Sequence, residues 1–314
     1  PPSFKAGIAV GIGVFIAFIG LVYGGIVEKS PAGVLKLGDV RSLHVLLPFA
    51  GLIIMAALSR LRVRGAMLIG MLVITIAALP FGIVQYHGVM SAPPSIEPTF
   101  LKMDLLAALR PEYWPLILVF LFMDLFDTIG TVVGVTQQAG LMKEDGTVPK
   151  LREILITDSA ASVLGAALGT STVVTYVESS AGVQEGGRTG LTAIVAGLLF
   201  LAALFFEPLA KMIGGGFAPG GGSITLYPVI APALVFVGSM LLRNAARIDF
   251  SDITESLPAF LVIIGMPLTY SIADGLAFGF ISYPIIKLLT GRFREVHPIM
   301  FALGAVFILR YAFL

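Results

Sequence analysis

Long apolar runs recur along the whole chain, and they constrain its fold more than any other feature. A transmembrane helix needs about 20 mostly apolar residues. Only 12% of the residues are charged and 57% are hydrophobic, against about 25% charged in soluble domains. A signal peptide does not explain a pattern that repeats from end to end. The sequence therefore predicts an all-α membrane protein with spans near 5–24, 43–59, 65–84, 113–135, 153–168, 189–210, 226–242, 256–273, 275–290 and 298–314.

The composition also excludes several classes of function. A formal net charge of +1 provides no basic surface for nucleic acid. The absence of cysteine excludes disulfides and thiolate metal sites. His44, His87 and His297 are too far apart in sequence to form a recognisable ligand pair. We therefore expect no metal and no cofactor. Because the sequence begins Pro-Pro-Ser without a methionine, we also expect that an N-terminal portion precedes it.

The distribution of basic residues predicts how the chain threads the membrane. Cytoplasmic loops carry an excess of Lys and Arg. If Lys5 lies inside, the inside set is Lys5, Arg60, Arg62, Arg64, Lys143, Lys150, Arg152, Arg188, Arg243, Arg247, Lys287, Arg292 and Arg294. The outside set is then the smaller one, Lys29, Lys36, Arg41, Lys102, Arg110 and Lys211, with Arg310 left unassigned. This threading requires one further crossing between residues 169 and 188.

That further crossing is predicted to be a broken helix. Residues 169–177 read Gly-Thr-Ser-Thr-Val-Val-Thr-Tyr-Val, which favours an extended backbone and is too short to span a membrane. Residues 178–188 are long enough only for a half-helix before the pair Gly186-Gly187. Exposed backbone groups at membrane depth have to line a cavity or be buried in protein. Interrupted spans of this kind mark the binding sites of transporters.

Three acidic residues are the candidates for chemistry. Asp124 and Asp127 are three positions apart in the span 113–135, so they lie on one helix face with Thr128 and Thr131. A charge at the bilayer centre costs about 2.5–3.5 kcal/mol, so this stripe is expected to face protein or water. Glu178 stands where the extended segment meets the half-helix, and burial and the helix N-terminus act on its protonation in opposite directions. Such carboxylates, with exposed backbone groups, suit a planar heterocycle as substrate.

Each of these acids also has a structural interpretation. Asp124 and Asp127 could be a hydrogen-bonding pair that joins helices, and Glu178 could only cap its half-helix. Asp158 is interpreted as a member of a supporting polar network, and Glu185 and Arg188 as an interfacial ion pair. Span-end groups and a flexible external loop are expected at the remaining polar positions, namely Glu207, Asp274 and residues 214–222.

The sequence argues against two other classes of membrane protein. An intramembrane aspartyl protease would pair aspartates from different helices around a Gly-x-Gly-Asp motif, which is absent from the sequence. A channel would need a continuous polar pore lining, whereas the polar residues here concentrate around one broken helix. The sequence therefore favours a transporter, and the protein is not expected to be an enzyme.

Several motifs resemble the AzgA-type adenine, guanine and hypoxanthine permeases of the nucleobase–cation symporter group, in the xanthine/uracil permease superfamily. The resemblance runs along the whole chain. It is carried by Phe122-Met-Asp-Leu-Phe-Asp-Thr-Ile-Gly-Thr131, Gly169-Thr-Ser-Thr172, Tyr176-Val-Glu-Ser-Ser-Ala-Gly-Val183, Glu185-Gly-Gly-Arg-Thr-Gly-Leu-Thr192 and Met266-Pro-Leu-Thr-Tyr-Ser-Ile-Ala-Asp-Gly275. It implies import of purine nucleobases with protons by alternating access. Another nucleobase, such as uracil or xanthine, is the alternative substrate.

The resemblance also implies an architecture and a site. Such permeases have fourteen transmembrane segments in two inverted repeats, which form a core domain and a gate domain. Gate segments are expected at 1–84 and 226–290, core segments at 113–210, and a C-terminal segment at 291–314. The first four segments of the family pattern have no counterpart in this sequence. The substrate contacts implied are Asp124, Asp127, the backbone of Val177 and Glu178, with Asp127 and Glu178 as candidates for proton coupling.

The resemblance finally implies partners and a location. The expected partners are a purine nucleobase, a proton and the lipid bilayer, with no nucleic acid. A homodimer formed through the gate is possible in this architecture. The expected location is the inner (plasma) membrane of a cell, crossed many times.

Overall fold

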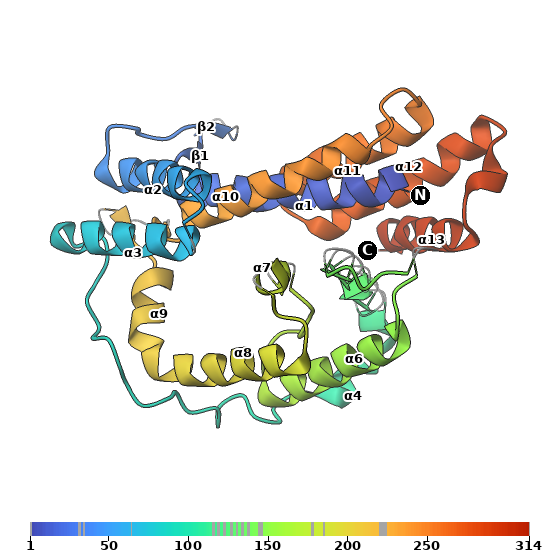
Figure 1. Cartoon of the computed structure of the whole chain (residues 1–314). Coiled ribbons are helices and arrows are strands. Elements are labelled where there is room, and N and C mark those ends of the chain that lie inside the picture. The colour runs from blue at the N-terminus through green and yellow to red at the C-terminus, as the bar shows by residue number, and fades with distance from the viewer. Residues whose placement is uncertain are drawn as a thin grey trace. The chain divides into compact units, whose positions relative to one another are not determined.

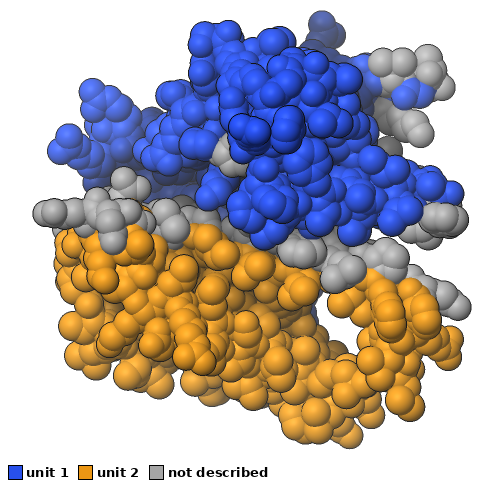
Figure 2. Space-filling view, turned by 90° about the vertical axis from the view of Figure 1, so that its right-hand side faces the viewer, with its two compact units in different colours: residues 1–89, 208–314 blue, residues 90–207 orange. Residues whose placement is uncertain are grey.

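A computed structural model gives the arrangement of the helices (Figure 1). It describes residues 2–30, 33, 35–63, 65–114, 117, 120–121, 124–125, 128–129, 131–132, 135–136, 139–143, 147–176, 179–184, 186–219 and 225–313. The described chain divides into two compact units, coloured separately in Figure 2. Unit 1 consists of residues 1–89 and 208–314, and unit 2 of residues 90–207.

Unit 1 is formed by the two ends of the chain. Its helices are α1 (Pro2–Tyr23), α2 (Leu43–Arg60), α3 (Ala66–Ala78), α9 (Glu207–Gly214), α10 (Ala231–Leu241), α11 (Ile253–Thr269), α12 (Ile272–Leu289) and α13 (Pro298–Phe313), although the first residue of α9 is assigned to unit 2. Helix α1 packs along α10 and α11, and α12 packs between α11 and α13 (Figure 1). Helices far apart in sequence therefore make up its core.

Small residues allow the helices of unit 1 to approach closely. A Cβ atom on Gly238 of α10 would lie 2.3 Å from the carbonyl oxygen of Gly13 on α1. Likewise, a Cβ atom on Gly7 would lie 2.8 Å from the Cβ of Ala259 on α11. In membranes, where lipid is as apolar as leucine, such close backbone contact is a main source of helix association. Glycine at these positions therefore fixes how α1 crosses α10 and α11.

Two short hairpin-like pairings close loops of unit 1. Strand β1 (Val27–Lys29) pairs antiparallel with β2 (Leu35–Leu37), with Glu28 opposite Lys36. The two side chains form an ion pair of 2.9 Å. Phe217 and Leu226 exchange backbone hydrogen bonds of 2.7 Å at the base of the glycine-rich loop. A loop was predicted at residues 214–222, but neither pairing was predicted.

Unit 2 contains the predicted broken helix. Its described helices are α4 (Leu105–Ala108), α6 (Leu151–Leu168), α7 (Ser179–Gln184) and α8 (Gly190–Ala203). The described residues between Trp114 and Thr136 are also helical, and we call them the acidic segment because they include Asp124. Residues 170–176, which we call the broken segment, adopt no regular secondary structure. As predicted, a non-helical stretch therefore separates α6 from a short helix.

The helices agree with the predicted spans in position. Within the described residues, four helical stretches are long and apolar enough to cross a membrane, Pro2–Tyr23, Leu43–Arg60, Gly190–Gly214 and Ile272–Leu289. Shorter apolar helices occupy Ala66–Phe81, Ile253–Thr269 and Pro298–Ala312. Many large apolar side chains on these helices are exposed, as expected where lipid is the solvent. The division into core, gate and inverted repeats stays a prediction.

Candidate functional site

The acidic segment turns its polar side inward. The side chains of Thr128 and Thr131 are 1% and 5% exposed, whereas those of Phe120 and Leu121 are 60% and 55% exposed. This is the reverse of a soluble amphipathic helix, and it is the pattern of a helix surrounded by lipid. The prediction that the polar stripe faces protein or water is confirmed for the two threonines.

Asp124 is held by the broken segment. The hydroxyl of Thr172 donates a 2.7 Å hydrogen bond to Asp124 Oδ1. Thr172 Oγ1 also lies 2.9 Å from Ser162 Oγ, on α6. Ser162 in turn donates to the carbonyl of Val173 at 2.8 Å and accepts from its backbone N–H at 3.2 Å. The carboxylate is thereby linked to backbone groups that have lost their helical partners.

Asp158 of α6 makes a second link beside the first. Its Oδ2 accepts a 2.9 Å hydrogen bond from the hydroxyl of Thr128, and its Oδ1 accepts one of 3.4 Å from Thr175. One carboxylate thus joins the acidic segment, α6 and the broken segment. The expectation that Asp158 belongs to a supporting network is confirmed.

The chain geometry explains why the broken segment leaves α6 where it does. Gly169 follows the last residue of α6 with φ of +83°, a left-handed conformation that favours glycine. Its backbone N–H bonds to the carbonyl of Ala166, and that of Thr170 bonds to the carbonyl of Gly165. Gly165 has little free space, because a Cβ atom there would lie 2.9 Å from Thr170 Oγ1. Two glycines therefore let the chain turn back along α6.

The structure describes one of the four predicted substrate contacts. Asp124 is described, with the contacts given above. Asp127, Val177 and Glu178 lie outside the described residues. Thr128 adjoins the position of Asp127, and Thr175 is two positions before that of Val177. Sequence reasoning did not single out Thr172 and Ser162, although the richness in threonine of residues 169–177 was noted.

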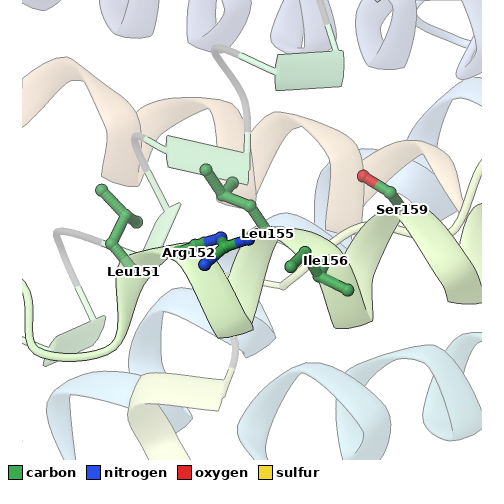
Figure 3. Close-up of a pocket in the computed structure, with 5 residues that line it drawn as sticks. All are labelled: Leu151, Arg152, Leu155, Ile156 and Ser159. Carbon is green, nitrogen blue, oxygen red and sulfur yellow. The ribbon is translucent and has the colours of Figure 1, made fainter.

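An open cleft lies along another side of α6. Its volume is about 540 Å³, and its lining includes Leu151, Arg152, Leu155, Ile156 and Ser159, all from this helix (Figure 3). Asp124, the one predicted substrate contact among the described residues, is not part of the described lining. Across the part of the chain that the structure describes, no three His, Asp or Glu side chains are grouped as a metal site requires. The polar network of Asp124 and Asp158 therefore remains the candidate site.

Unit 1 has a separate cluster of charges at one end of α11 and α12. Lys287, fully buried on α12, lies 2.9 Å from Glu255 Oε1 and 2.8 Å from Glu295 Oε2. Arg292 bonds to Asp252 at 2.6 Å and to Glu295 at 2.8 Å. Each carboxylate therefore has a cation beside it.

Two members of this cluster, outside the predicted membrane spans, have shifted pKa values. Hydrogen bonds from Thr254 and Arg292 lower the pKa of Asp252 to about 2. Hydrogen bonds from Arg292 and Lys287 lower the pKa of Glu295 to about 2. Both groups are therefore ionised at neutral pH, where they join α11 to the connection between α12 and α13.

Comparison with known proteins shows which family the chain matches. Residues 1–278 match the model of the Permease family. A putative permease of Methanocaldococcus jannaschii is 43% identical over 315 residues, which cover all of this chain and 70% of that protein. The adenine permease AdeP of Escherichia coli is 40% identical over 314 residues, covering all of this chain and 68% of the relative. The guanine/hypoxanthine permease PbuG of Bacillus subtilis is 43% identical over 317 residues, covering all of this chain and 69% of PbuG.

Apolar helices, a broken span and an inward-facing acidic segment define a helical membrane transporter. The matches to permeases agree with this class and confirm that the protein is a transporter, not an enzyme. The chain belongs to the Permease family. The resemblance to adenine and guanine/hypoxanthine permeases, stated from the motifs, is also confirmed.

Proposed function

We propose that this protein imports purine nucleobases, namely adenine, guanine or hypoxanthine, together with protons. One observation carries the proposal: relatives named as adenine and guanine/hypoxanthine permeases are 40% and 43% identical to it over its whole length. The matched regions include the acidic segment and the broken segment. The chemistry of the site agrees, because carboxylates accept hydrogen bonds from the ring N–H groups of a purine.

In this proposal the substrate lies between the acidic segment and the half-helix. Asp127 and Glu178 are its carboxylate contacts, Val177 offers its backbone, and Asp124 lies beside them. The links from Asp124 to Thr172 and from Asp158 to Thr128 and Thr175 support it, since they hold the acidic segment to α6 and to the broken segment that precedes the half-helix. A site that reads a planar ring needs its polar groups fixed in this way.

Transport would proceed by alternating access between a core and a gate. The core comprises residues 113–210, and the gate comprises 1–84 and 226–290, arranged as inverted repeats with a C-terminal segment at 291–314. The division into two compact units, with a boundary near residues 89 and 208, supports this assignment. Protonation of Asp127 or Glu178 would accompany substrate binding. The protein would act in the inner membrane, in contact with lipid, and could dimerise through the gate.

The test is uptake of labelled adenine, guanine, hypoxanthine and uracil by cells that express the complete gene, with and without a protonophore. Asp127→Asn and Glu178→Gln are compared with the wild type at matched amounts of membrane protein. Glu207→Gln serves as a control, because Glu207 begins α9 and is not among the proposed contacts.

Saturable purine uptake that the protonophore abolishes, and that both site variants lose while the control retains it, is the expected result. Preference for uracil, or full uptake by Asp127→Asn and Glu178→Gln, would contradict the proposed substrate or site. Uptake that persists with the protonophore and requires sodium would contradict the proposed coupling to protons, but not the proposed substrate or site.

A further inference from the structure

An arginine beyond α7 caps the helical end of the acidic segment. Arg188 Nη1 donates a hydrogen bond to the carbonyl oxygen of Ala139. Ala139 is within the last turn, because its N–H bonds to the carbonyl of Val135 at 2.8 Å. The next residue, Gly140, has φ of +66°, and the N–H of Leu141 returns to the carbonyl of Thr136 at 3.0 Å. This is the pattern of a helix that ends in a left-handed glycine.

The turn that ends α7 positions Arg188 for its contact with Ala139. The N–H of Gly187 bonds to the carbonyl of Gly182 at 2.9 Å, and that of Gly186 bonds to the carbonyl of Val183 at 3.1 Å. Gly186 has φ of +100°. A Cβ atom on Gly187 would lie 2.8 Å from Thr192 Cγ2. The glycine pair therefore forms a tight helix end that a larger residue would disturb, and Arg188 follows it at once.

The contact brings the positive guanidinium of Arg188 to the partly negative end of a helix. The last carbonyl groups of a helix carry partial negative charge, so a cation beside them is favourable. Arginine suits this role because its guanidinium stays ionised and offers several donors in a fixed plane. The sequence suggested instead that Arg188 pairs with Glu185, which lies outside the described residues. The acceptor in the structure is the carbonyl oxygen of Ala139, at the helix end.

We propose that Arg188 is a positioning residue for the transport site. It fixes the end of the acidic segment to the end of α7. Two threonines of the broken segment act elsewhere, because Thr172 holds Asp124 and Thr175 holds Asp158 of α6. The two segments that Arg188 joins carry or adjoin the positions of Asp127 and Glu178. This inference rests on the proposed function, because the loss of the contact acts on substrate affinity through those two carboxylates.

Kinetics of purine uptake provide the first test. Arg188→Gln retains hydrogen-bond donors but removes the charge, and Arg188→Lys retains the charge. Arg152→Gln is the matched control, because it removes an exposed arginine on α6 in the same unit. We expect a KM about tenfold higher in Arg188→Gln, partial recovery in Arg188→Lys, and no change in the control. A merely structural loss would reduce the amount of protein and Vmax while KM stayed constant, and that result would overturn the inference.

A distance measurement tests the same contact without relying on transport. The 314 residues contain no cysteine. Spin labels are placed at Leu141→Cys and Thr189→Cys, after any cysteine elsewhere in the complete gene has been replaced by serine. We expect a narrow distribution of label distances that broadens when Arg188→Gln is added. An unchanged distribution would overturn the inference. If the distribution broadens but the wild type takes up no purine, the contact is supported and the proposed function is the part that fails.

Discussion

Thr172 Oγ1 donates a 2.7 Å hydrogen bond to Asp124 Oδ1, across 48 positions of sequence. This contact gives Asp124 a partner within the protein. The family resemblance makes Asp127 the stronger candidate for the substrate contact and Asp124 its rival. The contact agrees with this order, because it engages Asp124 in holding the broken segment. We therefore expect Asp127 to be the more important of the two for the substrate.

Removal of the Thr172 hydroxyl should weaken this link. In Thr172→Val the carboxylate of Asp124 loses a donor, and a hydrogen bond to a charged group contributes about 1.5–3 kcal/mol. We expect a lower melting temperature and a higher KM for purine uptake. Thr170→Val is the control, because the Thr170 hydroxyl bonds only locally, to the carbonyl of Ser171. Equal effects in the two variants would show that the Asp124 contact has no special importance.

Asp158 should tolerate partial replacement better than complete removal. Its two carboxylate oxygens accept separately from Thr128 and Thr175. Asparagine keeps one acceptor oxygen and alanine keeps none, so each lost bond costs about 1–3 kcal/mol. We expect melting temperatures in detergent to fall in the order wild type, Asp158→Asn, Asp158→Ala. If the asparagine and alanine variants melt together, the two hydrogen bonds do not act separately.

The Arg292 ion pairs should make stability depend on acidic pH. The pKa of Asp252 falls from 3.8 to about 2, and that of Glu295 from 4.5 to about 2, on folding. Their stabilising contribution is therefore complete above about pH 4.5 and is lost as the pH falls towards 2. Arg292→Gln should melt below the wild type at pH 6, with a gap that narrows in acid. Melting curves from pH 6 to pH 2.5 test this, and a constant gap would contradict it.

Two glycine-to-alanine substitutions should have opposite effects. A Cβ atom at Gly238 would lie 2.3 Å from the Gly13 carbonyl, so Gly238→Ala should force α1 and α10 apart and cost about 1–3 kcal/mol. Gly197 of α8 has no atom within 4 Å of such a Cβ. Alanine there should stabilise the helix by about 0.5–1 kcal/mol. Expression and melting temperature measure both, and a neutral Gly238→Ala would contradict the close crossing.

Helix positions were largely predictable from the sequence. The predicted span 153–168 corresponds to α6 at Leu151–Leu168, and the span 43–59 to α2 at Leu43–Arg60. Hydrophobic length determines these elements, and it is a local property of the chain. The span predicted from 226 was less accurate, since α10 begins at Ala231 after the pairing of Phe217 with Leu226. That pairing joins residues on both sides of a glycine-rich loop, and no local sequence pattern indicates such a pairing.

The partners of the site residues were the less predictable part. Sequence spacing placed Asp124 and Thr128 on one face, and burial of Thr128 agrees with it. It could not determine that Thr172 contacts Asp124, or that Asp158 contacts Thr128 and Thr175, because these contacts depend on how three segments pack. Arg188 illustrates the same limit, since its contact with the carbonyl of Ala139 also depends on how the segments pack. The predicted pair with Glu185 stays a prediction, because Glu185 lies outside the described residues.

The packing of α1 against α10 and α11 has a consequence for synthesis in the cell. About 200 residues separate the end of α1 from the start of α10, which corresponds to about 10–40 s of translation at 5–20 residues per second. During that interval α1 lies in the bilayer without the glycine crossings that hold it later. All of residues 90–207 are made in the meantime. Unit 1 is therefore completed last, and a ribosome that stalls before α10 leaves α1 exposed to membrane quality control.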